Sequence, residues 1–101
     1  MKDKSYNQVK YYWGVMMPMI GYFKGWSNAR AHQWVKETWN IETTTTMTTI
    51  EYEELMNWVR VHTNLRWDMV IPLPNEDLDR EAEKLPPEAL FKKYNPNLQK
   101  N

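Results

Sequence analysis

The sequence predicts a mainly α-helical fold with a core of three helices. Apolar residues recur at three- and four-residue steps in three separate stretches, and helix-capping residues precede those stretches. A run of four threonines, residues 43–46, interrupts this pattern between the second and third stretches. With 101 residues the chain is expected to form a single helical domain over residues 1–76, followed by a charged C-terminal tail over residues 77–101.

The first predicted helix covers about residues 6–24. Ser5 and Gln8 form a Ser-x-x-Gln capping box, which satisfies early backbone N–H groups. Pro18 lies inside the helical pattern, and its ring would crowd the carbonyl of Gly14, so we expect a kink. The stripe is wide enough for burial on more than one side, and it consists of Val9, Tyr12, Trp13, Met16, Ile20 and Phe23, widened by Tyr11, Val15 and Tyr22.

The second predicted helix begins at once. Gly25 supplies a left-handed stop for the first helix, and Ser27 is the N-cap of the next, which runs to about Trp39. After it, residues 41–47 are expected to be extended, as a short strand or hairpin, because the β-branched threonines disfavour helix. A connector is a better interpretation of this segment than a phosphate-binding site. The core face of the second helix consists of Ala31, Trp34, Val35 and Trp39.

The third predicted helix opens with a second capping box, Thr48 and Glu51, and ends near residues 64–65. Residues 69–75 are expected to be extended, because residues before proline avoid the helical region. The tail that follows is expected to be loosely attached, with a short helix from about Pro87 to Tyr94. The core stripe of the third helix is expected to consist of Tyr52, Leu55, Met56, Val59 and His62 or Thr63. The tail is expected either to pack through Leu85, Leu90 and Phe91 or to dock only in an oligomer.

The composition excludes several classes of protein. The chain has no cysteine, so disulfides, thiol chemistry and most structural zinc sites are excluded. The sequence contains no apolar run long enough to predict a transmembrane span, and its mean hydropathy is −0.81. The N-terminus does not show the basic and then apolar pattern of a secretory signal peptide. We therefore expect a cytoplasmic location, which would be the cytoplasm of the host cell if a phage encodes the protein.

The formal net charge is zero, but the charges are unevenly distributed. Residues 1–40 contain six basic and two acidic side chains, whereas residues 41–76 contain two basic and six acidic ones. This asymmetry permits a basic face for phosphates, a self-complementary pairing of two copies, or a solvated surface without either role.

Enzymatic chemistry has little support in the sequence. His32 and His62 lie on different predicted helices, and no glycine-rich loop precedes a helix. The carboxylates at Glu51, Glu53 and Glu54 are explained by the helix macrodipole. We therefore expect no catalytic residue, no cofactor, no metal site and no small-molecule substrate. A metal-dependent nuclease is retained only as an alternative that ranks below the two binding functions described next.

Single-strand binders combine a basic groove with exposed aromatic rings that stack on bases. Basic residues lie among fourteen aromatic residues in this chain, which makes single-stranded DNA a candidate ligand. The alternative is a protein-interaction module without affinity for nucleic acid. The candidate contacts with nucleic acid are Lys10, Lys24, Arg30, Lys36, Arg60 and Arg66, and the candidates for stacking or for an interface are Trp26, Trp58 and Trp67.

Five motifs follow one another over roughly residues 5–76: Ser5-x-x-Gln8-x-x-Tyr11-Tyr12-Trp13-Gly14, Pro18-Met19-Ile20, Gly25-Trp26-Ser27 with His32 and Lys36, Thr48-Thr49-x-Glu51-Tyr52, and Ile71-Pro72-x-Pro74-Asn75-Glu76. Taken in this order, they resemble the NinB (Orf) family of phage recombination proteins, in particular its small relatives in phage and prophage genomes. Longer members of that family place a β-rich segment ahead of the first motif, and this chain starts almost at that motif.

The resemblance implies a homodimeric protein without catalytic chemistry that assists recombination. Such proteins act on single-stranded DNA, including DNA coated by single-strand-binding protein, and help to load a strand-exchange protein. The positions to which the resemblance assigns phosphate contacts are Lys10, Lys36 and Arg60.

Overall fold

The computed structural model describes residues 6–99, apart from the side chains of Tyr6, Glu76 and Asp79. Across this part of the chain the fold is mainly α-helical and has no β-strand, so the predicted fold class is confirmed. The elements are α1 (Tyr6–Tyr11), a π-helical segment η1 (Tyr12–Met16), α2 (Met17–Lys24), α3 (Asn28–Thr38), α4 (Thr49–Trp67), α5 (Glu76–Lys84) and α6 (Pro87–Tyr94).

The elements α1, η1 and α2 follow one another without a break and form one long helix. In η1 the helix is wider, because the N–H of Met17 donates to the carbonyl of Tyr12, five residues earlier. Pro18 has no N–H to donate to the carbonyl of Gly14, and a π-turn just ahead of it accommodates this loss. The distortion predicted from Pro18 therefore takes the form of a wider turn.

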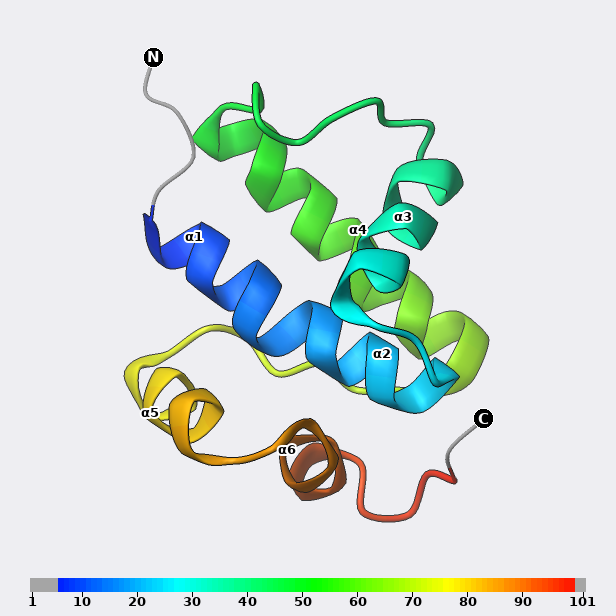
Figure 1. Ribbon diagram of the computed structural model, residues 1–101, viewed down its shortest axis with the longest axis vertical. Coiled ribbons are helices and arrows are strands. Elements are labelled where there is room, and N and C mark those ends of the chain that lie inside the picture. Colours follow the sequence, from blue (N-terminus) through cyan, green and yellow to red (C-terminus); the bar gives the residue numbers. More distant parts are fainter. Residues whose placement is uncertain (1–5, 100–101) are drawn as a thin grey trace.

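The long helix crosses the middle of the molecule, with α3 and α4 on one side and α5 and α6 on the other (Figure 1). Its residues are buried on both sides, as the wide apolar stripe predicts. Trp13, which the prediction placed on that stripe, is instead 37% exposed. The buried hydrophobic side chains of the long helix are Tyr11, Tyr12, Val15, Met16, Met17, Met19, Ile20 and Phe23.

Two further expectations for the middle of the chain need correction. Residues 41–47 form turns and irregular structure, not a strand or hairpin. The helix α4 opens with the predicted capping box of Thr48 and Glu51, but it continues to Trp67, beyond the predicted end. Asp68 then takes the left-handed conformation (φ 56°) and ends the helix. An exposed aspartate tolerates this conformation, and the sequence pattern gave no glycine to indicate it.

The first predicted capping box lies partly outside the described residues, because Ser5 is not among them. Gln8 makes a different contact. Its side-chain amide donates to the carbonyl of Thr49 over 3.1 Å, and so connects α1 to the start of α4.

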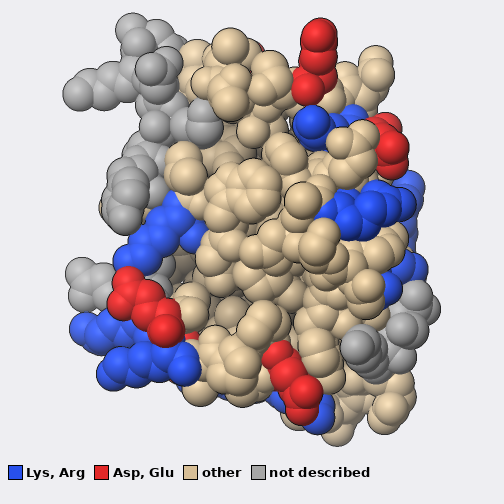
Figure 2. Space-filling view, in the orientation of Figure 1, with Lys and Arg blue, Asp and Glu red and all other residues tan. Residues whose placement is uncertain are grey.

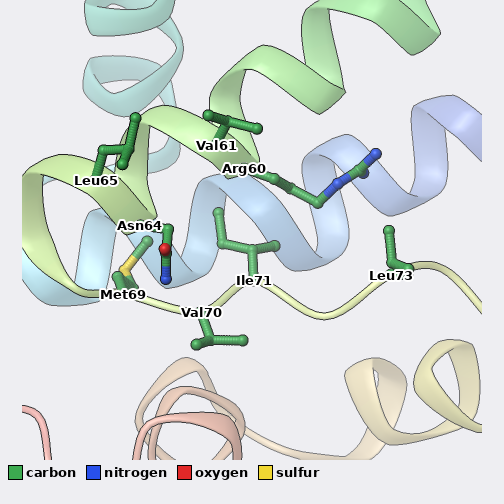
Figure 3. A pocket seen from close by; sticks show the side chains of 8 residues that line it. All are labelled: Arg60, Val61, Asn64, Leu65, Met69, Val70, Ile71 and Leu73. Carbon is green, nitrogen blue, oxygen red and sulfur yellow. The ribbon is translucent and has the colours of Figure 1, made fainter.

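Residues 69–75 connect α4 to α5 as an extended segment, as predicted (Figure 3), and side chains hold this segment in place. The hydroxyl of Tyr11 donates to the carbonyl of Pro72 over 2.6 Å. The side chain of Asn95 accepts from the N–H of Val70 at 2.6 Å and donates to its carbonyl at 2.9 Å. The segment therefore connects the long helix to the C-terminal part of the chain.

The expectation of a loosely attached tail is wrong. The predicted helix from Pro87 to Tyr94 is present as α6, and α5 precedes it. Leu78, Leu90 and Phe91 are at most 1% exposed and belong to the same apolar core as the long helix. The high charge of the tail indicated solvation, but its few apolar residues recur at positions that face the core.

Candidate nucleic-acid interface

The turn between α2 and α3 positions a group of aromatic side chains that has two cations beside it. Gly25 ends α2 in the left-handed conformation (φ 75°), as predicted. The hydroxyl of Ser27 accepts from the N–H of Arg30 at 3.1 Å and caps α3. Between these two residues, Trp26 is placed beside the last turn of α2 and the first turn of α3.

Close packing against Gly21 fixes the position of Trp26. The N–H of Trp26 donates to the carbonyl of Gly21 over 2.7 Å. A Cβ atom at position 21 would lie 2.5 Å from the carbonyl oxygen of Trp26. Because the obstructing atom belongs to the backbone, a side-chain rotation cannot relieve the contact, and the turn requires glycine at this position.

Two cations lie over the rings of this turn. The Arg30 guanidinium carbon is 4.5 Å from the centre of the Trp26 ring. The Lys24 ammonium lies 5.6 Å from the Trp26 ring and 5.2 Å from the Trp67 ring. These distances fall within the range in which a ring quadrupole attracts a cation.

Trp34 connects the two ends of the group. Its ring centre lies 6.3 Å from that of Trp26 and 5.0 Å from that of Trp67. Trp67 comes from the end of α4 and also contacts Phe23, at 5.4 Å. The rings are half-buried, so each combines a packed part with an accessible part. We call Lys24, Trp26, Arg30, Trp34 and Trp67 the tryptophan–cation cluster.

The charge of the cluster is positive. The acidic group that the structure places beside it is Glu37, whose carboxylate is 3.9 Å from the Arg30 guanidinium. Both side chains are about half exposed, so this ion pair is weak and can exchange for another anion. Arg66 is exposed and directly precedes Trp67 in the sequence, and no ion pair among the described residues involves it.

The other three predicted contacts with nucleic acid, Lys10, Arg60 and Lys36, lie outside the tryptophan–cation cluster. Lys10 pairs with Glu83 of α5 at 2.7 Å, which lowers the pKa of that carboxyl. Arg60 is 11% exposed, pairs with Glu53 at 3.6 Å and donates to the hydroxyl of Tyr11 at 3.2 Å. These cations connect elements within the chain. Figure 2 likewise shows lysine and arginine in separate groups around the margin of one face, with an uncharged area across its middle.

Lys36 lies on α3, near His32. The Tyr12 hydroxyl and Nδ1 of the His32 imidazole form a hydrogen bond of 2.7 Å. Burial, with a smaller contribution from Lys36, lowers the pKa of His32, and burial raises the pKa of Tyr12. The proton therefore stays on the tyrosine, and the pair acts as a structural hydrogen bond.

Trp58 is 49% exposed on α4 and does not join the cluster. It lines a cleft of about 240 Å³ together with Trp39 and Met47. His62 lies edge-on to Trp39 at 5.1 Å, whereas the ring neighbours of His32 are Tyr12 and Trp13. Within residues 6–99 no three side chains of His, Asp or Glu are grouped closely enough to hold a metal ion.

The predictions named Lys24, Arg30, Trp26 and Trp67 as candidates without indicating that they lie in one region, whereas no contact within the described residues connects the fifth candidate, Arg66, to them. They also missed Trp34 as a member of the cluster, because its position on the core face of α3 predicted burial. Trp26 precedes the N-cap of α3, so helical spacing in the sequence did not relate it to Trp34.

No family model, curated protein or solved structure matches the chain. In the described part of the chain, no helix has the length and apolarity that are needed to cross a membrane.

Proposed function

We propose that this chain is a non-catalytic accessory protein of DNA recombination, similar to the NinB (Orf) family, and that it binds single-stranded DNA through the tryptophan–cation cluster. In this proposal a base stacks against the accessible part of Trp26 or Trp67. Lys24, Arg30 and Arg66 provide contacts with the phosphates. In this proposal the chain forms a homodimer, and it also binds DNA that is coated by single-strand-binding protein.

The observation on which the proposal rests is the placement of Lys24 over two tryptophan rings at once. Binding to single strands without sequence preference needs rings for the bases and cations for the backbone within the same few ångströms. The tryptophan–cation cluster offers both, on a turn whose shape is fixed by Gly21 and Gly25.

Lys10 and Arg60, which the resemblance favours as phosphate contacts, are assigned a structural role in this proposal. Both form ion pairs with carboxylates inside the chain, so a phosphate would have to displace those carboxylates. The proposal therefore moves the expected binding face from these residues to the α2–α3 turn.

The test is a titration of a fluorescently labelled single-stranded oligonucleotide, followed by anisotropy at low salt. Replacing Trp26 by leucine keeps an apolar side chain in the packed part of the cluster but removes the stacking surface. Because a stacked base contributes about 1–3 kcal/mol, the affinity should fall by about 5- to 160-fold.

The matched control is Trp13→Leu, since Trp13 is 37% exposed and belongs to η1, outside the cluster. Its affinity should equal that of the unmodified protein. Equal losses in the two variants, or no binding of the unmodified protein at low salt, would contradict the proposal.

A second function, a protein-interaction module without affinity for nucleic acid, is favoured by a different observation. Several large apolar side chains of α4 face solvent, which is typical of a protein interface. If the oligonucleotide fails to bind, this function takes precedence.

A further inference from the structure

The connector between α3 and α4 folds back beside the start of α4, and Figure 1 shows it in green between the two helices. Helix α3 ends at Trp39, and Asn40 then takes the left-handed conformation (φ 54°). Further along, the N–H of Met47 donates to the carbonyl of Thr44 over 3.2 Å, and the Thr44 side chain is buried. The threonine-rich segment is therefore a folded turn that holds Met47 in place.

A cleft of about 240 Å³ lies between this connector and α4. Its α4 wall consists of residues three or four positions apart, which share one face of a helix: Glu51, Glu54, Leu55 and Trp58. Trp39 and Met47 line it from the connector. Pockets for drug-sized ligands have volumes of about 300–1,000 Å³, so this cleft is suited to a smaller group.

Two tryptophan rings face this space. The ring of Trp39 is nearly perpendicular to Trp34 at 5.7 Å and to His62 at 5.1 Å, and these neighbours fix its orientation. Trp58 is 49% exposed, and within the described residues no ring contact joins it to Trp39. The cleft therefore offers two rings that are separate enough to contact one ligand from different sides.

The charge of the cleft is negative. Its lining contains two carboxylates and no lysine or arginine. Glu51 accepts at Oε1 from the N–H of Thr48 over 2.9 Å, as part of the capping box. Glu54 is exposed, and no ion pair among the described residues includes either glutamate. The cleft thus combines tryptophan with negative charge, whereas the tryptophan–cation cluster combines it with positive charge.

The lining also indicates which kind of cation fits. Within residues 6–99 no group of three His, Asp or Glu side chains is placed to hold a metal ion. A primary ammonium has three N–H donors, but Glu51 and Glu54 carry the only carboxylates of the lining, and one oxygen of Glu51 is already used. A quaternary ammonium has no N–H group to satisfy, and aromatic rings attract its charge through their faces.

We propose that this cleft binds a quaternary ammonium group, with Trp39 and Trp58 against its methyl groups and Glu54 beside its charge. This assigns a ligand class to Trp58, which lies outside the tryptophan–cation cluster. The proposal goes beyond the binding of DNA and does not depend on it.

The probe for the test is choline, titrated into the isotope-labelled full chain without oligonucleotide. The assigned indole N–H signals of Trp39 and Trp58 should shift in nuclear magnetic resonance spectra, and equal concentrations of sodium chloride should not shift them. Dimethylbutanol, the neutral analogue in which carbon replaces the ammonium nitrogen, should bind at least about tenfold more weakly, because it lacks the charge that the rings and Glu54 attract.

Two variants test the assigned residues, with the Trp39 signal as the readout. Trp58→Leu should weaken choline binding by about five- to thirtyfold, and Glu54→Gln by about threefold. Both side chains are exposed, so the helical circular dichroism should be kept. The matched controls are Trp13→Leu in η1 and Glu88→Gln on α6, which lie outside the cleft and should leave the affinity unchanged.

A peptide that contains trimethyllysine distinguishes two sources of the ligand. Binding about tenfold tighter than that of choline would support a modified lysine of a partner protein, and equal or weaker binding would support a free small molecule. Unshifted signals with choline, equal binding of choline and dimethylbutanol, or equal losses in Trp58→Leu and Trp13→Leu would overturn the proposal. Since Trp58→Leu should leave oligonucleotide binding unchanged, failure here is distinct from failure of the proposed function.

Discussion

Alanine at Gly21 should destabilise the protein, although alanine favours helix more than glycine does. The new Cβ would lie 2.5 Å from the carbonyl oxygen of Trp26, and ordinary contacts begin at 3.4 Å. The α2–α3 turn would have to move by nearly an ångström. That movement would lengthen the 2.7 Å hydrogen bond from the N–H of Trp26 to the carbonyl of Gly21.

Two opposing effects determine the size of this change. The higher helix propensity of alanine stabilises the folded state by about 1 kcal/mol. Forced overpacking costs about 1–3 kcal/mol, and a weakened backbone hydrogen bond adds about 1 kcal/mol. We therefore expect Gly21→Ala to lower the free energy of unfolding by about 2 kcal/mol.

Gly14→Ala provides the matched control, because it introduces the same methyl group into the same long helix. Apart from the adjacent residues and the backbone of its own helix, no heavy atom lies within 4 Å of the position that its Cβ would occupy. This variant should therefore be neutral or more stable, by up to about 1 kcal/mol. Urea unfolding of both variants, followed by tryptophan fluorescence, measures the difference.

The two glycine variants should thus change stability in opposite directions. In addition, Gly21→Ala should weaken oligonucleotide binding, since it displaces Trp26 from the cations beside it. If Gly21→Ala proves as stable as Gly14→Ala, the close approach of the turn to α2 is wrong, and with it the fixed position of the tryptophan–cation cluster.

Three further predictions concern stability, and urea unfolding measures each. Asn95→Ala should cost about 2 kcal/mol, because it leaves the N–H and carbonyl of Val70 without their partner; a loss below about 0.5 kcal/mol would argue against this connection. Thr48→Ala should cost about 1 kcal/mol by removing the capping box of α4, whereas Thr48→Ser should retain most of the stability. The pKa of His32 is lowered from its ordinary value of 6.5, so the folded state binds fewer protons than the unfolded state. The contribution of His32 to the free energy of unfolding should therefore be fully present above pH 6.5 and decrease as the pH falls below that value. This decrease should be smaller in His32→Gln. An equal decrease in both proteins would exclude His32 as the source.

Local signals in the sequence predicted the helix boundaries where a single residue type determines the geometry. Gly25 and Ser27 fixed the α2–α3 turn, because few residues other than glycine accept a left-handed φ and serine is a strong N-cap. The end of α4 was missed because Asp68 takes a conformation that aspartate only occasionally adopts. The position of a helix end is predictable only when the residue there has few alternatives.

The C-terminal part of the chain could not be predicted in the same way. Its high charge indicated solvation, but Leu78 and Phe91 are nearly completely buried against the long helix. Burial of a few apolar residues in a charged segment depends on long-range packing, and α2 supplies the surface that receives α6. Composition averages over the segment, whereas packing depends on the particular positions.

The candidate site illustrates the same limit. Basic and aromatic residue types were identified, but their grouping depends on how α2, α3 and α4 meet. In the sequence, Lys10 and Lys24 are both lysines among aromatic residues, and nothing distinguishes them. In the structure, Lys10 forms an ion pair with Glu83, whereas Lys24 lies over two tryptophan rings. Only the three-dimensional arrangement distinguishes a cation that joins elements from one that is placed for a ligand.

The most direct measurement of the central claim is the salt dependence of oligonucleotide affinity. If Lys24, Arg30 and Arg66 each contact a phosphate, the logarithm of the affinity should fall against the logarithm of the salt concentration with a slope of about −2. Lys24→Ala should reduce the magnitude of that slope by about 0.7, whereas Lys10→Ala should leave it unchanged. A slope near zero, or a slope that responds to Lys10 and not to Lys24, would contradict the assignment of the tryptophan–cation cluster as the binding site.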